Sequence, residues 1–253
     1  MVAAPLSGIT ALRDAAGPPG CPPLPSRFLR HSDEHTVVGM QAVRAAIATL
    51  PEADRDCSLH GVIAAPCQAG RILTATSLAL LATGGGVTVS PHIVPQCSLH
   101  SLAGAISVAL GMKGPHLGVS GGPDAIAEGL FTALSLLHEP AAGMAPPGMW
   151  LVFTAWDDEP ALAADGAALD DPTCRAVALL LRPGATAPLG LVLDPAAAVP
   201  AGGLHRPLVD FTAIIDRLAT GDAAAAWPLP GRVPGAMRLV SSSTAAACGR
   251  EAA

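Results

Sequence analysis

The sequence has few aromatic and few charged side chains. It contains no tyrosine, and aromatic residues make up 3% and charged residues 13% of its 253 residues. Lys and Arg number 14 against 20 Asp and Glu, which gives a net charge of −6, and the basic residues form no stripe. A nucleic-acid-binding surface needs clustered basic side chains and often aromatic rings for stacking. We therefore expect no nucleic acid among the partners.

The chain also lacks a long uninterrupted apolar run. Hydrophobic residues make up 51% of the sequence, yet no stretch reaches the roughly 18 to 20 consecutive apolar residues of a membrane span. The first five residues, Met1 to Pro5, lack the basic start and apolar core of a secretory signal. We expect no membrane span and a cytoplasmic location. The apolar excess then indicates a surface that meets another protein.

Motifs for metal or cofactor binding are sparse. The 6 cysteines include no Cys-x-x-Cys pair, which favours reduced thiols over a disulfide framework or a zinc site. His31 and His35 have a spacing that could share one helix face, but no third ligand lies nearby in the sequence. The acidic run 157–159 ends a predicted strand and is interpreted as a polar strand end. We therefore expect no metal and no cofactor.

Apolar patterning predicts an α/β protein with a central sheet. The Pro- and Gly-rich residues 1–23 are interpreted as a lead-in segment, and the small-residue stretch 241–253 as a disordered tail. Between them, spacings of three and four predict helices over 33–50, 72–82, 100–110, 124–137 and 208–219. Short apolar runs predict strands over 61–65, 117–120, 150–155, 176–181 and 190–193.

Residues 90–115 resemble a stretch of the β-ketoacyl synthases. Ser90-Pro91 opens it, small residues follow between 100 and 110, and Gly114-Pro115 closes it. Across residues 24–240 the chain is similar to the short ketosynthase-like proteins of type II polyketide and aryl polyene pathways. The resemblance implies one β-ketoacyl synthase-like domain with a thiolase-like α/β fold. This would be the N-terminal half of that fold, with a mixed central sheet flanked by helices.

The resemblance also places the reactive position of the family. In β-ketoacyl synthases a Gly-Pro pair leads into a strand and then to a nucleophilic Cys at a turn that opens a helix. Counting from Gly114-Pro115, that position falls on Pro123 or Asp124, and neither carries a thiol. The histidines of the second thiolase half have no counterpart in the sequence either. The resemblance thus implies no catalytic residue.

A relative without catalytic residues is expected to act by binding partner proteins. The resemblance implies a chain-length-factor-like subunit that forms a heterodimer with a full-length β-ketoacyl synthase and works with acyl carrier protein. Small residues in the helix 100–110 would permit close approach, and the strand 117–120 would pair across the dimer axis. The expected interface residues are Ala103, Gly104, Ala105, Ser107, Leu117 and Val119.

Two other functions remain open from the sequence. An active acyltransferase or thioesterase would use Cys97 or Cys67 as its nucleophile. A homodimeric module that binds acyl carrier protein would need a local basic patch such as Arg27, Arg30 and Arg44, because acyl carrier proteins are acidic.

Overall fold

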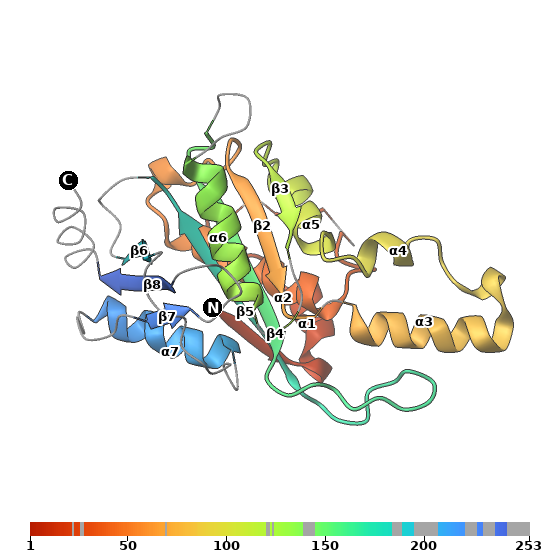
Figure 1. Cartoon of the computed structure of the whole chain (residues 1–253). Helices are drawn as coiled ribbons and strands as arrows, with labels where there is room; N and C mark the ends of the chain where they lie inside the picture. Colours follow the sequence, from red (N-terminus) through yellow and green to blue (C-terminus); the bar gives the residue numbers. More distant parts are fainter. Residues whose placement is uncertain are drawn as a thin grey trace.

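A mixed five-stranded sheet in the order β1-β5-β4-β2-β3 forms the centre of the molecule (Figure 1). The computed structural model describes residues 1–21, 23–25, 28–68, 70–119, 122, 124–138, 145–183, 189–194, 207–220, 227–229 and 236–241. The strands are β1 (Val2–Pro5), β2 (Gly61–Pro66), β3 (His116–Gly118), β4 (Met149–Trp156) and β5 (Thr173–Leu181). β2 runs parallel to β3 and β4, whereas β5 is antiparallel to both β4 and β1. The expected α/β class with a mixed sheet is confirmed.

The two central strands are buried on both faces. Every residue of β2 and of β4 is buried. A strand that is covered by helices on both sides needs apolar residues at consecutive positions, because successive side chains point to opposite faces. This explains why both strands appear in the sequence as continuous apolar runs without alternation.

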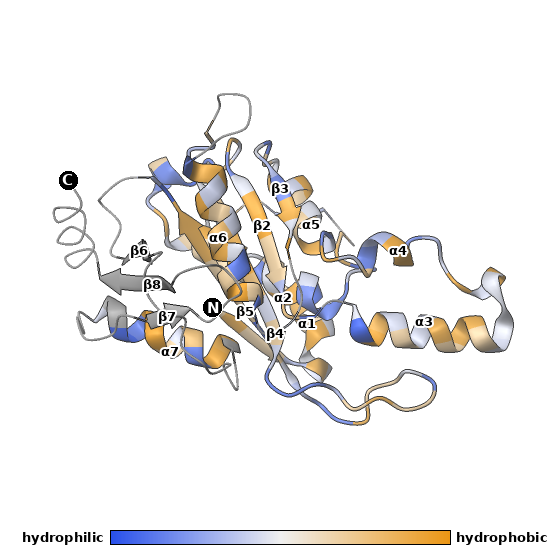
Figure 2. Cartoon of the chain, in the orientation of Figure 1, coloured by the Kyte–Doolittle hydropathy of each residue, from blue (hydrophilic) through white to orange (hydrophobic). Residues whose placement is uncertain are grey.

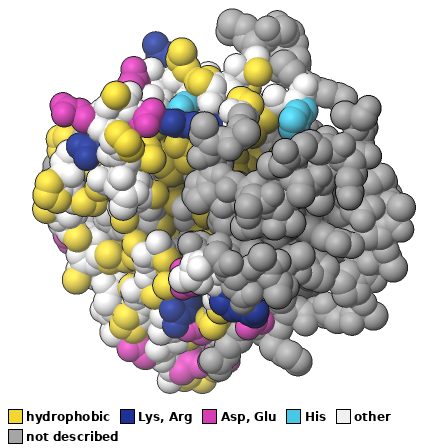
Figure 3. Space-filling view, turned by 90° about the vertical axis from the view of Figure 1, so that its left-hand side faces the viewer, with side chains coloured by type: hydrophobic (Ala, Val, Ile, Leu, Met, Phe, Trp, Pro, Cys, Tyr) yellow, Lys and Arg dark blue, Asp and Glu magenta, His cyan; other side chains and the backbone are white. Residues whose placement is uncertain are grey.

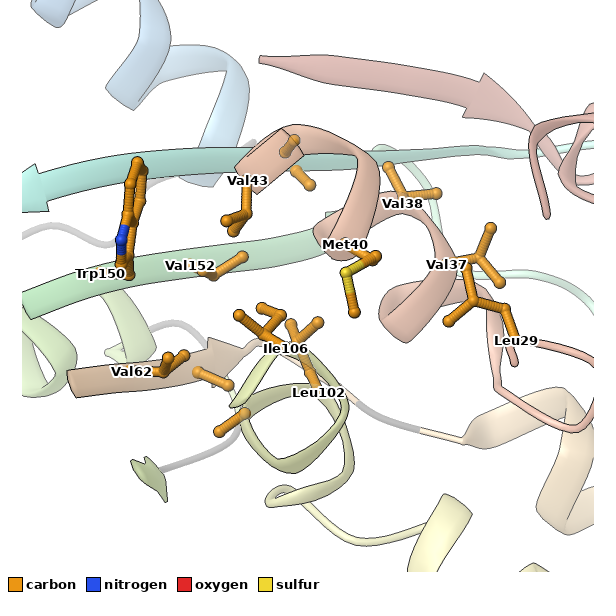
Figure 4. Packing of buried hydrophobic residues seen from close by; sticks show 14 of the residues in the cluster. Leu29, Val37, Val38, Met40, Val43, Val62, Leu102, Ile106, Trp150 and Val152 are labelled. Carbon is orange, nitrogen blue, oxygen red and sulfur yellow. The ribbon is translucent and has the colours of Figure 1, made fainter. Parts of the chain in front are cut away.

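Helices cover the sheet on both sides. On one side lie α1 (Ile9–Asp14), α2 (Glu34–Thr49) and α5 (Ser101–Leu110), and on the other α6 (Ala125–His138) and α7 (Pro207–Ala219). Figure 4 shows the first side, where Met40 of α2 and Ile106 of α5 pack over Val62 and Val152 of the sheet. On the second side Phe153 meets Phe211 edge to face, with 5.3 Å between ring centroids. None of the helices in the described ranges is both long and apolar enough to cross a membrane.

One helical segment projects away from the sheet. It consists of α3 (Arg71–Gly84), the 3-10 turn η3 (Gly86–Thr88) and α4 (Ile93–Gln96), and we call residues 71–96 the α3–α4 arm (Figure 1). No residue of α3 or α4 is buried, although hydrophobic positions recur along α3 (Figure 2). The helix expected over 72–82 is confirmed, and α4 is not among the helices expected from the sequence.

The N-terminal segment belongs to the folded body. β1 pairs with β5 in a register that sets Val2 opposite Ala176, and the Leu6 amide donates to the Pro172 carbonyl at 3.0 Å. Residues 1–23 were expected to be only a lead-in segment. Their described part instead contains the strand β1 and the helix α1.

A second sheet has the order β6-β8-β7 and comprises β6 (Leu189–Asp194), β7 (Trp227–Leu229) and β8 (Ala236–Ser241). β6 confirms the strand expected over 190–193. Residues 242–253 of the expected tail lie outside the described residues.

Candidate functional site

The turn between β3 and α6 is the place where the family resemblance expects a nucleophile. The Val119 amide donates to the Ala64 carbonyl at 2.9 Å, and the Gly122 amide donates to the Cys67 carbonyl at 2.5 Å, so the turn is tied to the end of β2. Gly122 has a φ of 97°, which favours glycine. Pro123 lies outside the described residues. Asp124 stands at the start of α6 and its carbonyl accepts from the Glu128 amide at 3.0 Å.

Cys67 is the thiol next to this turn. Its amide donates to the Thr154 carbonyl at 2.8 Å, which anchors it between β2 and β4. Burial, reinforced by the negative charge of Glu159, raises the pKa of the Cys67 thiol to about 11. At pH 7 only about one molecule in ten thousand would then carry the thiolate. A thiol nucleophile is usually activated by a lowered pKa, so this environment opposes the use of Cys67.

Cys97 packs against Gly70, the residue that precedes α3. It follows α4 at the end of the α3–α4 arm and lines an apolar cavity of about 230 Å³ with Leu78 and Val94. The ring of His100, the histidine close to it in the sequence, contacts His116 instead, with 5.2 Å between ring centroids. The arrangement of a thiol hydrogen-bonded to a base is absent at Cys97 among the residues that the structure describes.

Two of the acidic residues that follow β4 form ion pairs. Arg175 Nε donates to Asp157 Oδ1 at 2.5 Å, and Arg71 pairs with Glu159. The second pair joins the start of α3 to the segment after β4. These contacts support the interpretation of residues 157–159 as a polar strand end.

The two histidines of the sequence motif are separated by the fold. α2 begins at Glu34, so His31 precedes the helix, and its ring stacks on His92 with 6.2 Å between centroids. His35 is 1% exposed, and its Nδ1 lies 2.9 Å from Thr154 Oγ1. Burial lowers the pKa of His35 from its ordinary value. Within the described ranges no group of three potential metal ligands occurs.

The expected interface residues divide into an inner and an outer set. Ala103 is 0% exposed and packs in the core, while the Ser107 hydroxyl donates to the Met112 carbonyl at 2.9 Å inside the chain. Within this chain, both side chains therefore face the core and not the exposed surface of α5. Gly104 and Ala105 are half-buried on the outer side of α5.

The outer residues surround the edge of the sheet. β3 ends the strand order, and Leu117 on it is 40% exposed. Val119, just after β3, is half-buried and packs toward the α6 side of the core. Beside β3, α5 presents Val108, which is 73% exposed and lies one helical turn beyond Gly104. We call Gly104, Ala105, Val108 and Leu117 the edge face. The sequence argument missed Val108 because it singled out only small residues in this helix.

One side of the molecule shows no cluster of a single charge sign among its described residues (Figure 3). Figure 3 faces the side away from the α3–α4 arm, and its described part shows both charge signs scattered among hydrophobic side chains.

Similarity to known proteins is found among solved structures. No protein-family profile matches the sequence, and no curated protein matches it. Among solved structures, the chain is similar to the "Ketosynthase (ApeO) in Complex with its Chain Length Factor (ApeC)" from Xenorhabdus doucetiae. That match has 18% sequence identity and a TM-score of 0.52, and it covers 94% of this chain and 96% of the other. A β-ketoacyl synthase from Burkholderia phymatum STM815 matches at 16% identity over 83% of this chain and 57% of its own, with a TM-score of 0.42.

The first of these likenesses defines the class of fold. The mixed sheet with helices on both faces is the thiolase-like α/β fold of the ketosynthases. The thiolase-like α/β fold that the resemblance implied is thereby confirmed.

Proposed function

We propose that this protein is a non-catalytic, chain-length-factor-like subunit that pairs with an active β-ketoacyl synthase during fatty-acid or polyketide chain elongation. The matched solved structure contains a ketosynthase together with its chain length factor, and this chain spans nearly the whole length of the chain it matches. Acyl carrier protein would deliver its substrates to the assembled pair.

The edge face is the observation that carries this proposal. The end strand of a sheet presents backbone N–H and C=O groups that a second strand can pair with. Leu117 and Val108 place exposed apolar side chains beside that edge, and exposed apolar side chains gathered in one place mark sites of protein association. A partner strand laid along β3 would satisfy the backbone groups and cover both side chains.

The residues of the β3–α6 turn support a non-catalytic role. Condensation in the family begins with an acyl thioester on a cysteine, whereas this turn offers Pro123 and Asp124. The nearby thiol of Cys67 is held protonated by its burial, with a pKa of about 11. The alternative that relies on Cys67 or Cys97 therefore has no supporting geometry in the described part of the chain.

A homodimeric module that binds acyl carrier protein would need Arg27, Arg30 and Arg44 together on the surface. Arg44 is 2% exposed and cannot contact a protein surface. Arg27 lies outside the described residues, and Arg30 is exposed.

Co-expression with a full-length β-ketoacyl synthase tests the proposal. Leu117→Arg and Val108→Arg would each put a charge into a dry contact and weaken pairing by about tenfold or more, because an unpaired buried ion is costly. The matched control is Leu169→Arg, since Leu169 is 70% exposed in the segment that joins β4 to β5. We expect one-to-one co-elution for the wild type and the control, measured by size-exclusion chromatography with light scattering.

Gly104→Leu adds a steric test of the same surface. A Cβ at Gly104 would meet only the His100 ring, at 3.5 Å, so the isolated chain has room for a larger side chain. The variant should keep its circular dichroism spectrum and lose its partner. Co-elution of all three edge-face variants at wild-type stoichiometry would refute the proposed pairing. A homodimer of the isolated wild type that these variants dissociate would assign the edge face to a second copy instead.

A further inference from the structure

A second cavity lies beneath the N-terminal segment, on the α2 side of the sheet and apart from the edge face. It has a volume of about 430 Å³, within the usual range for small-molecule sites. Residues 13–17, 21, 23–25 and 28–29 form most of its wall, and Arg44 of α2 closes it from the inside. We call it the Arg44 cavity.

Arg44 is a buried cation with few partners. It is 2% exposed, and its Nη1 donates to Gln41 Oε1 at 3.1 Å. Its Nε is buried without a hydrogen-bond partner, although a guanidinium carries five N–H donors. Among the described residues, the ion pairs are Arg71 with Glu159, Arg175 with Asp157 and Arg182 with Asp54, so no carboxylate pairs with Arg44. A buried charge without a counter-charge is strongly unfavourable.

A second arginine, Arg13, lines the same cavity. Arg13 donates through Nη2 to the Ser32 carbonyl at 3.3 Å, and its Nε is likewise buried without a partner. Gln41, which accepts from Arg44, donates through Nε2 to the Leu12 carbonyl at 2.9 Å. This bond joins the end of α1, where Arg13 stands, to the helix that carries Arg44. Asp14 also lines the cavity, but it is exposed and makes no ion pair among the described residues.

The remaining wall is largely apolar. Leu24, Phe28 and Leu29 contribute hydrophobic side chains to it. Guanidinium groups match the paired oxygens of carboxylate and phosphate groups, and charge-assisted hydrogen bonds of this kind are strong when water is excluded. A ligand that suits this wall therefore carries an oxyanion on a small apolar body.

We propose that the Arg44 cavity binds a small oxyanionic ligand, a carboxylate or phosphate group on a short apolar chain, with Arg44 and Arg13 as the anion-binding residues. The oxyanion supplies the counter-charge for the buried guanidinium of Arg44. This binding site is independent of the pairing with a ketosynthase, because the edge face takes no part in it.

Isothermal titration calorimetry on the full chain tests the site. The probes are inorganic phosphate, butyl phosphate and butyrate, and sodium chloride at matched ionic strength is the control salt. We expect saturable binding of butyl phosphate or butyrate, tighter than that of inorganic phosphate. A preference for butyl phosphate assigns the oxyanion to a phosphate ester, and a preference for butyrate assigns it to a carboxylate.

Variants identify the residues. Arg44→Met keeps the length of the side chain and removes its charge, and it should weaken binding by about tenfold or more. Arg13→Gln should weaken binding to a smaller extent, and Arg30→Gln, at an exposed arginine outside this cavity, should bind as the wild type does. If Arg44→Met does not fold, the affinities of the wild type and of Arg13→Gln for the same probes test the proposal. The absence of saturable binding by the wild type, or wild-type affinity in both Arg44→Met and Arg13→Gln, would overturn the proposal.

Discussion

Asp33 joins the starts of two helices, and its replacement should lower the stability of the protein. Its Oδ1 accepts from the Thr36 amide at 2.9 Å and caps α2, while its Oδ2 accepts from the Gly70 amide at 2.8 Å at the start of α3. Asp33 is 1% exposed, so water cannot replace either bond. The carboxylate therefore holds the base of the α3–α4 arm against the body.

The cost of Asp33→Ala follows from these two bonds. Loss of an N-cap side chain costs about 1 kcal/mol, and a buried N–H group left without a partner costs about 1 to 3 kcal/mol. The free energy of unfolding should fall by about 2 to 4 kcal/mol. Asp33→Ser keeps one acceptor near the Thr36 amide and should lose less, because only the Gly70 amide is then unpaired.

Urea unfolding at pH 7, followed by circular dichroism, measures these losses. Asp171→Ala is the matched control, because Asp171 also accepts two hydrogen bonds, from the Ser7 amide and hydroxyl, yet it is exposed. We expect a clearly smaller loss for the control. If Asp33→Ala loses no more stability than Asp171→Ala, the carboxylate does not join the two helices in the way described.

Two further predictions concern titratable groups. Burial lowers the pKa of His35 below its ordinary value of 6.5, so the unfolded chain binds more protons than the folded one as the pH falls through this value. Stability should therefore decrease from pH 7.5 to 5.5, and His35→Gln should flatten this dependence in urea unfolding; an unchanged slope would contradict the assignment to His35. For Cys67, a pKa of about 11 against the ordinary 9.0 should slow alkylation by iodoacetamide at pH 8 by about tenfold to a hundredfold. Peptide mass spectrometry measures this rate, and alkylation at the rate of a free thiol would revive Cys67 as a nucleophile.

Local patterns in the sequence determined most of the regular structure. β2 and β4 were recognisable because strands buried on both faces must be apolar at every position. α2 was recognisable from its periodicity and from the acidic start at Asp33, which caps the helix in the structure. The stretch from Ser90 to Pro115 by itself indicates the ketosynthase-like fold. These signals depend on neighbours in the sequence, so the sequence alone contains them.

Tertiary contacts decided the remaining features. β1 is four residues long and carries no strand pattern of its own, and it is a strand because β5, more than 160 residues away, pairs with it. Ala103 and Gly104 are adjacent small residues, yet packing against the sheet places the first in the core and the second on the edge face. The burial of Arg44 and the raised pKa of Cys67 also arise from segments that are distant in the sequence. Burial depends on all the chain that surrounds a side chain, and for this reason only the fold shows which of these side chains are exposed and which are buried.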